Sequence, residues 1–307
     1  NLIYSNPVLF VTVIALILLM VVAAILAVAR SRIRAATMRS ELERAEADSR
    51  AKSSFLSRMS HEIRTPMNAV MGLADLTSMM KDVPEEVQGN LTKIRSSCQY
   101  LLSLINDILD MSRIDSGKMA IASEPFSLTG MLNDLQSMME TEAKARGLTL
   151  TVRTGIQHET LLGDAVRLRQ VLTNLLSNAL KFTPAGGHVV LQIQETGNDG
   201  ERGAFDFHVM DDGAGIPAED QKRIFDAFEQ AGNNVSRSQG TGLGLPISSS
   251  IVRLMGSEIR LVSEPGAGSD FSFTVSMPFA AAAEESKSEP ASLPQGTSLL
   301  LAEDNDL

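Results

Sequence analysis

The stretch DAVRLRQVLTNLLSNALKFT, residues 164–183, decides how the second half of this chain folds. Its leucines recur at spacings of three and four residues, the period of a helix with one buried face. Asn174 and Asn178 lie four residues apart on another face, and Lys181 follows within one turn of Asn178. Mg²⁺ takes few protein oxygens and completes its shell with water and phosphate. The stretch therefore predicts a helix that presents a Mg²⁺–phosphate site, with two ordinary surface amides as the alternative.

Segments with helix and strand patterns surround this helix. Residues 126–145 have a helical pattern opened by Ser127 or Thr129, and residues 241–255 predict a third helix. Alternating patterns predict strands at residues 148–154, 189–195, 204–210, 258–263 and 270–277. Because helices and strands do not alternate regularly, we expect an α+β two-layer sandwich, with helices over one face of a mixed sheet.

Two glycine motifs lie within this region. In MDDGAGIP, residues 210–217, Gly213 and Gly215 let the backbone approach a ligand closely. The neighbouring Asp211 can accept a hydrogen bond from an exocyclic amine such as that of adenine. The motif alone is often just a turn, which remains the alternative.

The second glycine motif, GTGLGL at residues 240–245, opens a predicted helix whose backbone amides can bind phosphate. A dinucleotide-binding reading requires a preceding strand. Here the polar stretch AGNNVSRSQ precedes the motif, which favours a mobile lid. The lysine of a Walker P-loop is absent from the motif.

A reactive histidine is predicted in SHEIRTPMN, residues 60–68. The apolar seam of this helix places His61 on the solvent side, where its imidazole can react, and Glu62 can accept its proton. Pro66 removes a helical hydrogen bond from the Glu62 carbonyl, which predicts a bend. A zinc protease motif would need a second histidine where Thr65 stands. An ordinary surface histidine is the alternative.

The next helix carries a regular apolar seam that includes Cys98, which we interpret as core packing. The chain breaks at residues 81–86 around Pro84, and Gly117 ends the second helix. The seam residues are Leu91, Ile94, Cys98, Leu101, Ile105 and Ile108. Two such helices cannot bury both faces alone, so we expect a homodimer that forms an antiparallel four-helix bundle, with two helices per chain.

An uncharged run of 22 residues, Val8–Ala29, precedes these helices. As a helix it covers about 33 Å, close to the roughly 30 Å hydrocarbon core of a bilayer. Arginines follow the run, at Arg30, Arg32, Arg34 and Arg39, whereas a signal peptide has basic residues before it. We expect a transmembrane helix with its C-terminal side in the cytoplasm. A buried core helix is the alternative.

Composition limits the possible protein classes. The chain has 307 residues, and hydrophobic residues make up 44% of it, so a buried core can form. A formal net charge of −10 argues against a nucleic-acid-binding protein. Cys98 is the only cysteine, which excludes an internal disulfide and a multi-cysteine metal site.

Taken in order, these motifs resemble those of the sensor histidine kinases over residues 50–280. SHEIRTPMN resembles the H-box, NLLSNALKFT the N-box, DDGAGIP the first glycine box, IFDAFEQ the F-box and GTGLGL the second glycine box. The terminal LLLAEDND resembles the first strand of a receiver domain, in which Glu303 and Asp304 would bind Mg²⁺; a generic strand with an acidic turn is the alternative. The resemblance implies a hybrid kinase with a catalytic domain of the histidine kinase and GHKL ATPase type.

The resemblance also implies residue roles. His61 is the expected phosphoacceptor, Glu62 its general base, and Thr65 the residue that orients water during dephosphorylation of a partner. Asn178 is the expected Mg²⁺ ligand, and Asp211 the carboxylate that reads adenine. The other residues expected at the ATP site are Asn174, Lys181, Gly213, Gly215, Phe225, Phe228, Arg237, Gly240, Thr241, Gly242 and Gly244.

Seven segments are expected, and both chain ends are expected to be cuts in a longer protein. They are the end of an extracytoplasmic region (1–6), a transmembrane helix (7–29), a juxtamembrane signalling helix (30–50), a dimerisation and histidine phosphotransfer domain (51–119), a catalytic ATP-binding domain (120–280), a linker (281–296) and the first strand of a truncated receiver domain (297–307).

The expected function is that of a kinase in the bacterial inner membrane, with its kinase domains in the cytoplasm. It transfers a phosphoryl group from Mg-ATP to His61 and then to an aspartate of its own or a separate receiver domain. Two alternatives remain. The same scaffold can act mainly as a phosphatase of a phospho-receiver, or it can be a degenerate, non-catalytic dimerisation scaffold.

Overall fold

The computed structural model describes residues 58–80, 83–227 and 242–280, Glu229, and residues 11–12, 14–16, 18–20, 30, 32, 38–39 and 55–56. The chain forms two compact units, one of residues 1–120 and 222–250, the other of residues 121–221 and 251–307. The predicted linker and receiver strand, and most of the juxtamembrane segment, lie outside the described residues.

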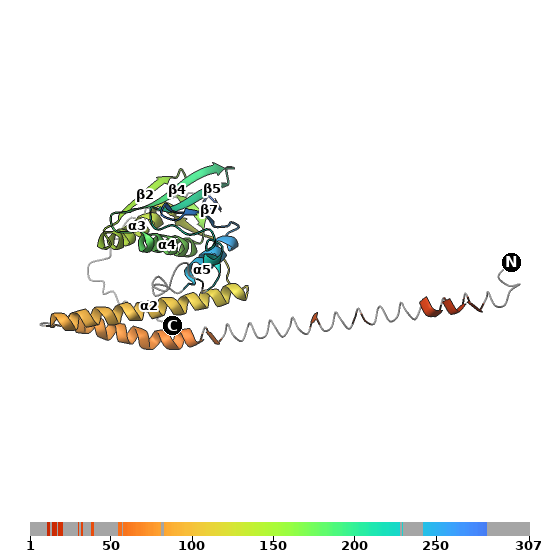
Figure 1. Ribbon diagram of the computed structural model, residues 1–307, viewed down its shortest axis with the longest axis horizontal. Helices are drawn as coiled ribbons and strands as arrows, with labels where there is room; N and C mark the ends of the chain where they lie inside the picture. The colour runs from red at the N-terminus through yellow and green to blue at the C-terminus, as the bar shows by residue number, and fades with distance from the viewer. Residues whose placement is uncertain are drawn as a thin grey trace, which may run out of the picture. The chain divides into compact units, whose positions relative to one another are not determined.

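A helical hairpin forms the main part of the first unit (Figure 1). Its first helix covers residues 58–78 and continues through Pro66, and α2 (Glu85–Asp115) begins directly after Pro84. Gly117 adopts φ 64°, and its amide donates to the Ile114 carbonyl at 2.9 Å, a common helix ending. The Arg64 guanidinium donates to the Asn106 side chain at 3.1 Å and joins the two helices. The predicted hairpin is therefore confirmed, as are the start of its second helix after Pro84 and the end of that helix at Gly117.

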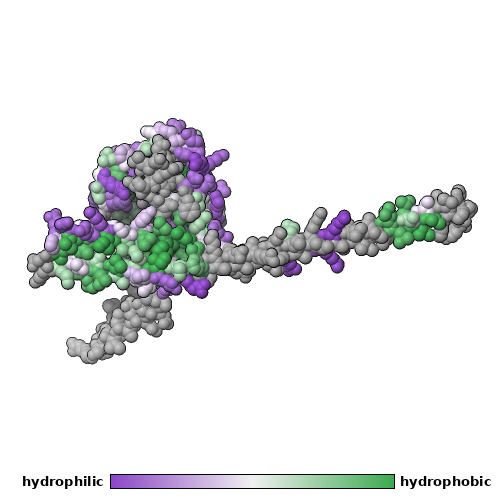
Figure 2. Space-filling model, turned by 60° about the horizontal axis from the view of Figure 1, so that its bottom comes forward, coloured by the Kyte–Doolittle hydropathy of each residue, from purple (hydrophilic) through white to green (hydrophobic). Residues whose placement is uncertain are grey.

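Apolar side chains remain exposed along this hairpin. Cys98 is buried, as predicted, but Ile94 and Leu101 of the same seam are 43% and 40% exposed. On the first helix, Leu73 and Leu76 are 65% and 66% exposed. Figure 2 shows apolar surface, in green, along the hairpin helices. One hairpin therefore leaves apolar surface of the kind that usually marks an interface.

A five-stranded mixed sheet forms the second unit, in the order β2-β4-β5-β7-β6. Its strands are β2 (Thr149–Gly155), β4 (His188–Asn198), β5 (Arg202–Asp211), β6 (Arg260–Glu264) and β7 (Gly268–Pro278). β2 pairs with β4 in parallel, whereas the other neighbours are antiparallel. The predicted strands are confirmed, with ends shifted by one to three residues.

Two helices cover one face of this sheet (Figure 1), which confirms the predicted two-layer sandwich. α3 (Leu128–Ala145) contacts β2, and α4 (Ala165–Phe182) contacts β4, β5 and α3. Leu172 and Leu175 of α4 are fully buried, as are Phe205 and Phe207 of β5. The core therefore lies between α4 and the central strands.

Helix caps explain where α3 and α4 begin. The Ser127 hydroxyl accepts from the Gly130 amide at 3.0 Å, and the Asp164 carboxylate accepts from the Arg167 amide at 2.9 Å. The predicted start of α3 at residue 126 was wrong, because Glu124–Ser127 forms β1. This strand pairs antiparallel with β3 (Thr160–Gly163) in a small second sheet that the sequence did not predict.

The third predicted helix is α5 (Gly244–Leu254), of which Gly244–Ser250 belongs to the first unit and Ile251–Leu254 to the second. Of the predicted transmembrane segment, residues 11–12, 14–16 and 18–20 are helical and exposed, and the rest lies outside the described residues. Within the described part of the chain, no helix is long and apolar enough to cross a bilayer.

Candidate functional site

The polar face of α4 supplies the first part of the candidate site. Leu175 and Leu176 are buried on the sheet side, while Asn174 and Asn178 are only half-buried. The Asn178 side chain makes no hydrogen bond to another residue in the described part of the chain. A half-buried amide of this kind retains its carbonyl oxygen for an external ligand.

Lys181 supplies a positive charge in the last turn of α4. Partial burial lowers the pKa of the Lys181 ammonium, and the nearby positive charge of Arg146 lowers it further. Its Nζ lies 4.6 Å from the centroid of the Phe182 ring. The Arg146 guanidinium is itself paired with Glu142 Oε1 at 2.9 Å, and the Lys181 ammonium can bind an anion such as phosphate.

Asp211 stands at the end of β5 and supplies a carboxylate. Burial raises the pKa of the Asp211 carboxyl, and the charge of Asp212 raises it further, while amide hydrogen bonds from Gly213 and Ser269 oppose both effects. The Gly213 amide donates to Asp211 Oδ1 at 2.9 Å. The carboxylate is therefore held in place by backbone donors and is half-buried next to α4.

Gly213 and Gly215 hold this loop against its neighbours. A Cβ atom at Gly213 would lie 2.7 Å from both the Phe182 carbonyl oxygen and Asp211 Oδ1. Gly215 has φ 67°, and a Cβ there would overlap the Glu264 carbonyl. The Ala214 amide donates to the Phe182 carbonyl at 3.3 Å. The structure thus brings the Asp211–Gly215 loop to the end of the helix that carries Asn178 and Lys181.

His188, the first residue of β4, binds the Asp212 carboxylate twice. The His188 amide donates to Oδ1 at 2.7 Å, and ring Nδ1 lies 3.0 Å from Oδ2. These hydrogen bonds, the backbone one foremost, lower the pKa of the Asp212 carboxyl. Sequence reasoning missed the pair, since its members lie 24 residues apart and only the β4–β5 register brings them together.

The loop is also fastened to the β6–β7 hairpin. The Ile216 amide donates to Ser263 Oγ at 2.8 Å, and the Gln221 side chain donates to the carbonyls of Ile216 and Ser263 at 3.0 and 2.9 Å. The Gly266 amide donates to the Ala214 carbonyl at 2.7 Å. The nucleotide loop predicted from the sequence is therefore a fixed part of the second unit.

The predicted phosphoacceptor lies in the first unit. His61 and Glu62 are exposed on the helix of residues 58–78, as predicted for His61, whereas the preceding Ser60 is buried. Thr65 is also exposed, and its hydroxyl donates to the His61 carbonyl at 3.2 Å. The imidazole is therefore accessible for reaction.

Other predicted residues of the first unit are described only in part. Phe225 is half-buried in the short helix η1 (Arg223–Phe225), Gly242 has φ 69°, and Gly244 begins α5. Phe228, Arg237, Gly240, Thr241, Glu303 and Asp304 lie outside the described residues.

The described residues fit Mg-ATP. Gly213 and Gly215 pack against the backbone of Phe182 and Glu264, which brings their loop to the end of the helix that carries Asn174, Asn178 and Lys181. In the described part of the chain, no group of three or more His, Cys, Asp or Glu side chains can hold a metal. Mg²⁺ bound through an amide oxygen, phosphates and water needs no such group.

Two segments of the chain match known protein families. Residues 51–117 match the His Kinase A (phospho-acceptor) domain, and residues 163–279 match the histidine kinase-, DNA gyrase B-, and HSP90-like ATPases. This chain belongs to the sensor histidine kinases. The family predicted from the five motifs is confirmed.

Relatives of this histidine kinase include a sensor protein and a signal transduction histidine-protein kinase of two bacteria. It is 40% identical over 252 residues to the sensor protein GacS of Pseudomonas syringae pv. syringae, covering 81% of this chain and 27% of GacS. It is 37% identical over 238 residues to the signal transduction histidine-protein kinase BarA of Escherichia coli K12, covering 76% of this chain and 26% of BarA. The chain thus spans about a quarter of the length of these relatives.

A solved structure supports the same fold for this histidine kinase. Full-length ShkA, crystallised in complex with AMPPNP, is 34% identical and superposes with a TM-score of 0.61, covering 75% of this chain and 47% of ShkA.

Proposed function

We propose that this chain is the kinase portion of a membrane-bound hybrid sensor histidine kinase, which uses Mg-ATP to phosphorylate its own His61. The observation that carries the proposal is the exposed His61 imidazole in a phospho-acceptor domain, on the same chain as the Asp211–Gly215 loop of an ATPase domain. The AMPPNP complex of ShkA supports adenine nucleotide as the ligand class.

The second unit binds and orients the nucleotide. The Asp211 carboxylate accepts a hydrogen bond from the exocyclic amine of adenine, and Gly213 and Gly215 let the loop pack closely against Phe182 and Glu264, which holds that carboxylate in place. Asn178, with Asn174 beside it, holds Mg²⁺, while the Lys181 ammonium binds phosphate oxygens. Mg²⁺ supplies neutralisation of the phosphate charge. The further residues that we assign to ATP binding are Phe225, Phe228, Arg237 and the glycine box from Gly240 to Gly244.

His61 is the nucleophile. One imidazole nitrogen attacks the γ-phosphorus, so that a P–N bond forms while the bond from phosphorus to the β–γ bridging oxygen breaks and ADP leaves with that electron pair. Glu62 accepts the proton from the other imidazole nitrogen. The phosphoryl group then passes to an aspartate of a receiver domain: a P–O bond to the carboxylate forms, the P–N bond breaks, and the proton held by Glu62 returns to the imidazole, which leaves neutral His61. Positioning and charge neutralisation supply most of the rate enhancement.

The remaining parts of the proposal concern assembly and location. Exposed Ile94, Leu101 and Leu73 support a homodimer in which two hairpins form a four-helix bundle. The uncharged run of residues 8–29, followed by arginines, supports a membrane span with the kinase domains in the cytoplasm. The terminal segment with Glu303 and Asp304 supports a receiver domain after the linker.

Autophosphorylation of the full chain in detergent tests this function. Radiolabelled ATP and Mg²⁺ should give an acid-labile label that His61→Ala abolishes. His158→Ala is the matched control, since it removes a half-exposed histidine of the second unit and should leave labelling intact. Acid-stable label, or label that survives His61→Ala, would contradict the proposal. Absence of AMPPNP binding would instead indicate a non-catalytic dimerisation scaffold.

Phosphatase activity on a phospho-receiver is the second candidate function, favoured by the exposed Thr65 hydroxyl one turn after His61. Thr65→Ala should slow decay of the phospho-receiver and spare autophosphorylation. Thr77→Ala is the matched control, because the Thr77 hydroxyl donates to the Leu73 carbonyl on the same helix at 2.7 Å. Equal decay rates for the two variants would exclude a role for Thr65.

A further inference from the structure

Hydrogen bonds between His188, the first residue of β4, and Asp212, the residue after β5, lie next to the Asp211–Gly215 loop. Three hydrogen bonds join the two residues, because the Asp212 amide also donates to the His188 carbonyl at 3.3 Å. An ionised carboxylate only accepts, so ring Nδ1 of His188 carries the hydrogen in this bond. The contact lies one residue from Asp211, which the proposed function assigns to adenine.

The other side of His188 leads to the helix that carries Asn178. Thr183 ends α4, and residues 183–187 form the turn into His188. The Gly186 amide donates to the Gly147 carbonyl at 2.8 Å, and the Thr149 amide donates to the Gly187 carbonyl at 3.0 Å. These hydrogen bonds hold the turn against the end of α3 and the edge strand β2, so the backbone that leads into His188 is fixed in position.

The packing at Gly187 shows how closely the two parts meet. A Cβ atom there would lie 2.7 Å from Asp212 Oδ1 and would overlap the Thr183 methyl group. The Asp212 carboxylate therefore fits against the turn at the end of α4 with no space for a further atom. Movement of the Asp211–Gly213 backbone away from α4 would break its bonds to His188.

We propose that His188 is a positioning residue of the nucleotide site: through Asp212 it holds the adenine-reading loop at a fixed place relative to the end of α4. This inference rests on the proposed ATP binding. His188 itself does not contact the nucleotide; it sets where the Asp211 carboxylate stands relative to Asn178 and Lys181. Because the Asp211 carboxylate is already held in its binding position before the nucleotide arrives, less conformational entropy is lost on binding.

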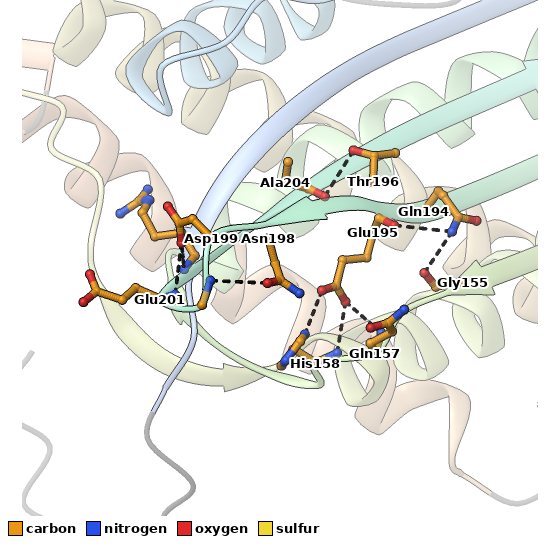
Figure 3. A network of polar contacts seen from close by, with 12 residues as sticks. Gly155, Gln157, His158, Gln194, Glu195, Thr196, Asn198, Asp199, Glu201 and Ala204 are labelled. Carbon is orange, nitrogen blue, oxygen red and sulfur yellow. Dashed lines mark hydrogen bonds and ion pairs between the residues drawn. The ribbon is translucent and has the colours of Figure 1, made fainter.

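His158, between β2 and β3, binds a residue of β4 and provides a matched control (Figure 3). The His158 amide and ring Nδ1 bind the Glu195 carboxylate at 3.1 and 2.7 Å, the same pairing of backbone and ring donors that His188 uses. Its ring stacks on Phe279 with centroids 3.9 Å apart. Glu195 lies seven residues beyond His188 on β4, so this contact cannot position Asp211 directly.

Calorimetric titration of the full chain in detergent, with Mg²⁺ and either AMPPNP or GMPPNP, tests the inference. The His188 and Asp212 side chains are 65% and 50% exposed, so we expect a moderate effect: His188→Ala should weaken AMPPNP binding about threefold to tenfold. GMPPNP binding should change little, because guanine has a carbonyl oxygen at the position of the 6-amino group of adenine that Asp211 reads. His188→Asn places an amide N–H near the position of Nδ1 and should restore most of the affinity.

The control and the unmodified chain separate the possible outcomes. His158→Ala should leave AMPPNP affinity unchanged, although it can lower the Tm of the second unit. Equal loss in His158→Ala and His188→Ala, equal loss for both nucleotides, or unchanged affinity in His188→Ala would each overturn the positioning role. Failure of the unmodified chain to bind AMPPNP would instead overturn the proposed function on which the inference rests.

Discussion

Replacing Gly215 with alanine should destabilise the folded state in two separate ways. The φ of 67° is a left-handed conformation that costs a residue with a Cβ about 1–2 kcal/mol. The new Cβ would also overlap the Glu264 carbonyl, so the loop must move and weaken its bonds to the β6–β7 hairpin. Those are the bonds from Ile216 to Ser263 Oγ and from Gly266 to Ala214. Two weakened hydrogen bonds cost about 1–2 kcal/mol more.

The summed destabilisation of about 2–4 kcal/mol should lower the Tm of the second unit by roughly 5–15 °C. Gly256→Ala is the matched control: its φ is 81°, in the same unit, but a Cβ there would meet nothing within 4 Å. It should therefore show only the conformational cost, about half of the total. The assay is scanning calorimetry of the full chain, followed by AMPPNP titration of the folded variants.

Each comparison can refute one step of the reasoning. A Tm decrease in Gly215→Ala no larger than in Gly256→Ala would show that the contact with Glu264 is relieved without cost. AMPPNP affinity should fall at least tenfold in Gly215→Ala and stay unchanged in Gly256→Ala. A Gly215→Ala protein with full affinity would show that this loop does not bind the nucleotide.

Three further predictions follow from burial and charge. Burial raises the pKa of Asp211, so this group favours the folded state below its unfolded pKa, and that contribution is lost as pH rises through the folded pKa. Asp211→Asn should therefore raise the Tm at pH 7 but not below about pH 4. The same variant should weaken AMPPNP binding about tenfold or more. An unchanged Tm at both pH values would refute the argument that burial of Asp211 is unfavourable at pH 7. Leu175 is a fully buried residue of α4, and Leu175→Ala should lower the free energy of unfolding by about 2–5 kcal/mol, as measured by urea denaturation. A loss of under about 1 kcal/mol would mean that α4 packs loosely. Leu101→Glu should dissociate the homodimer in sedimentation experiments. The control Gln99→Glu, at an exposed position of the same helix, should leave the homodimer intact. A monomeric unmodified chain would contradict the proposed four-helix bundle.

Local signals in the sequence predicted the helices well. α4 was placed to within one residue, because the leucine spacing defines its buried face and Asp164 caps its start. The hairpin turn followed from Pro84 and the end of α2 from Gly117, each of which acts on its own backbone. The Asp211 loop was also found from the sequence, since its two glycines and carboxylate are adjacent in the chain.

Features that depend on distant residues were not predicted. β1 and β3 have four residues each, with no alternation to distinguish them from loop, and only their pairing from Glu124 to Gly163 defines them. The contact between His188 and Asp212 likewise depends on the register of β4 and β5. The exposure of Ile94 and Leu101 has a related cause: an apolar seam indicates burial, but its period does not say which chain covers it.

The parallel pairing of β2 with β4 has a consequence for how the kinase matures. Thr149 pairs with His188, and the chain between them includes all of α4. A closed loop of that length forms slowly compared with the local β4–β5 hairpin, because more chain entropy is lost before contacts compensate for it. We therefore expect the β2–β4 pairing, which encloses the helix with Asn178 and Lys181, to form late in folding. ATP binding then reports on completion of the domain, and bound nucleotide stabilises the finished fold against unfolding by mass action.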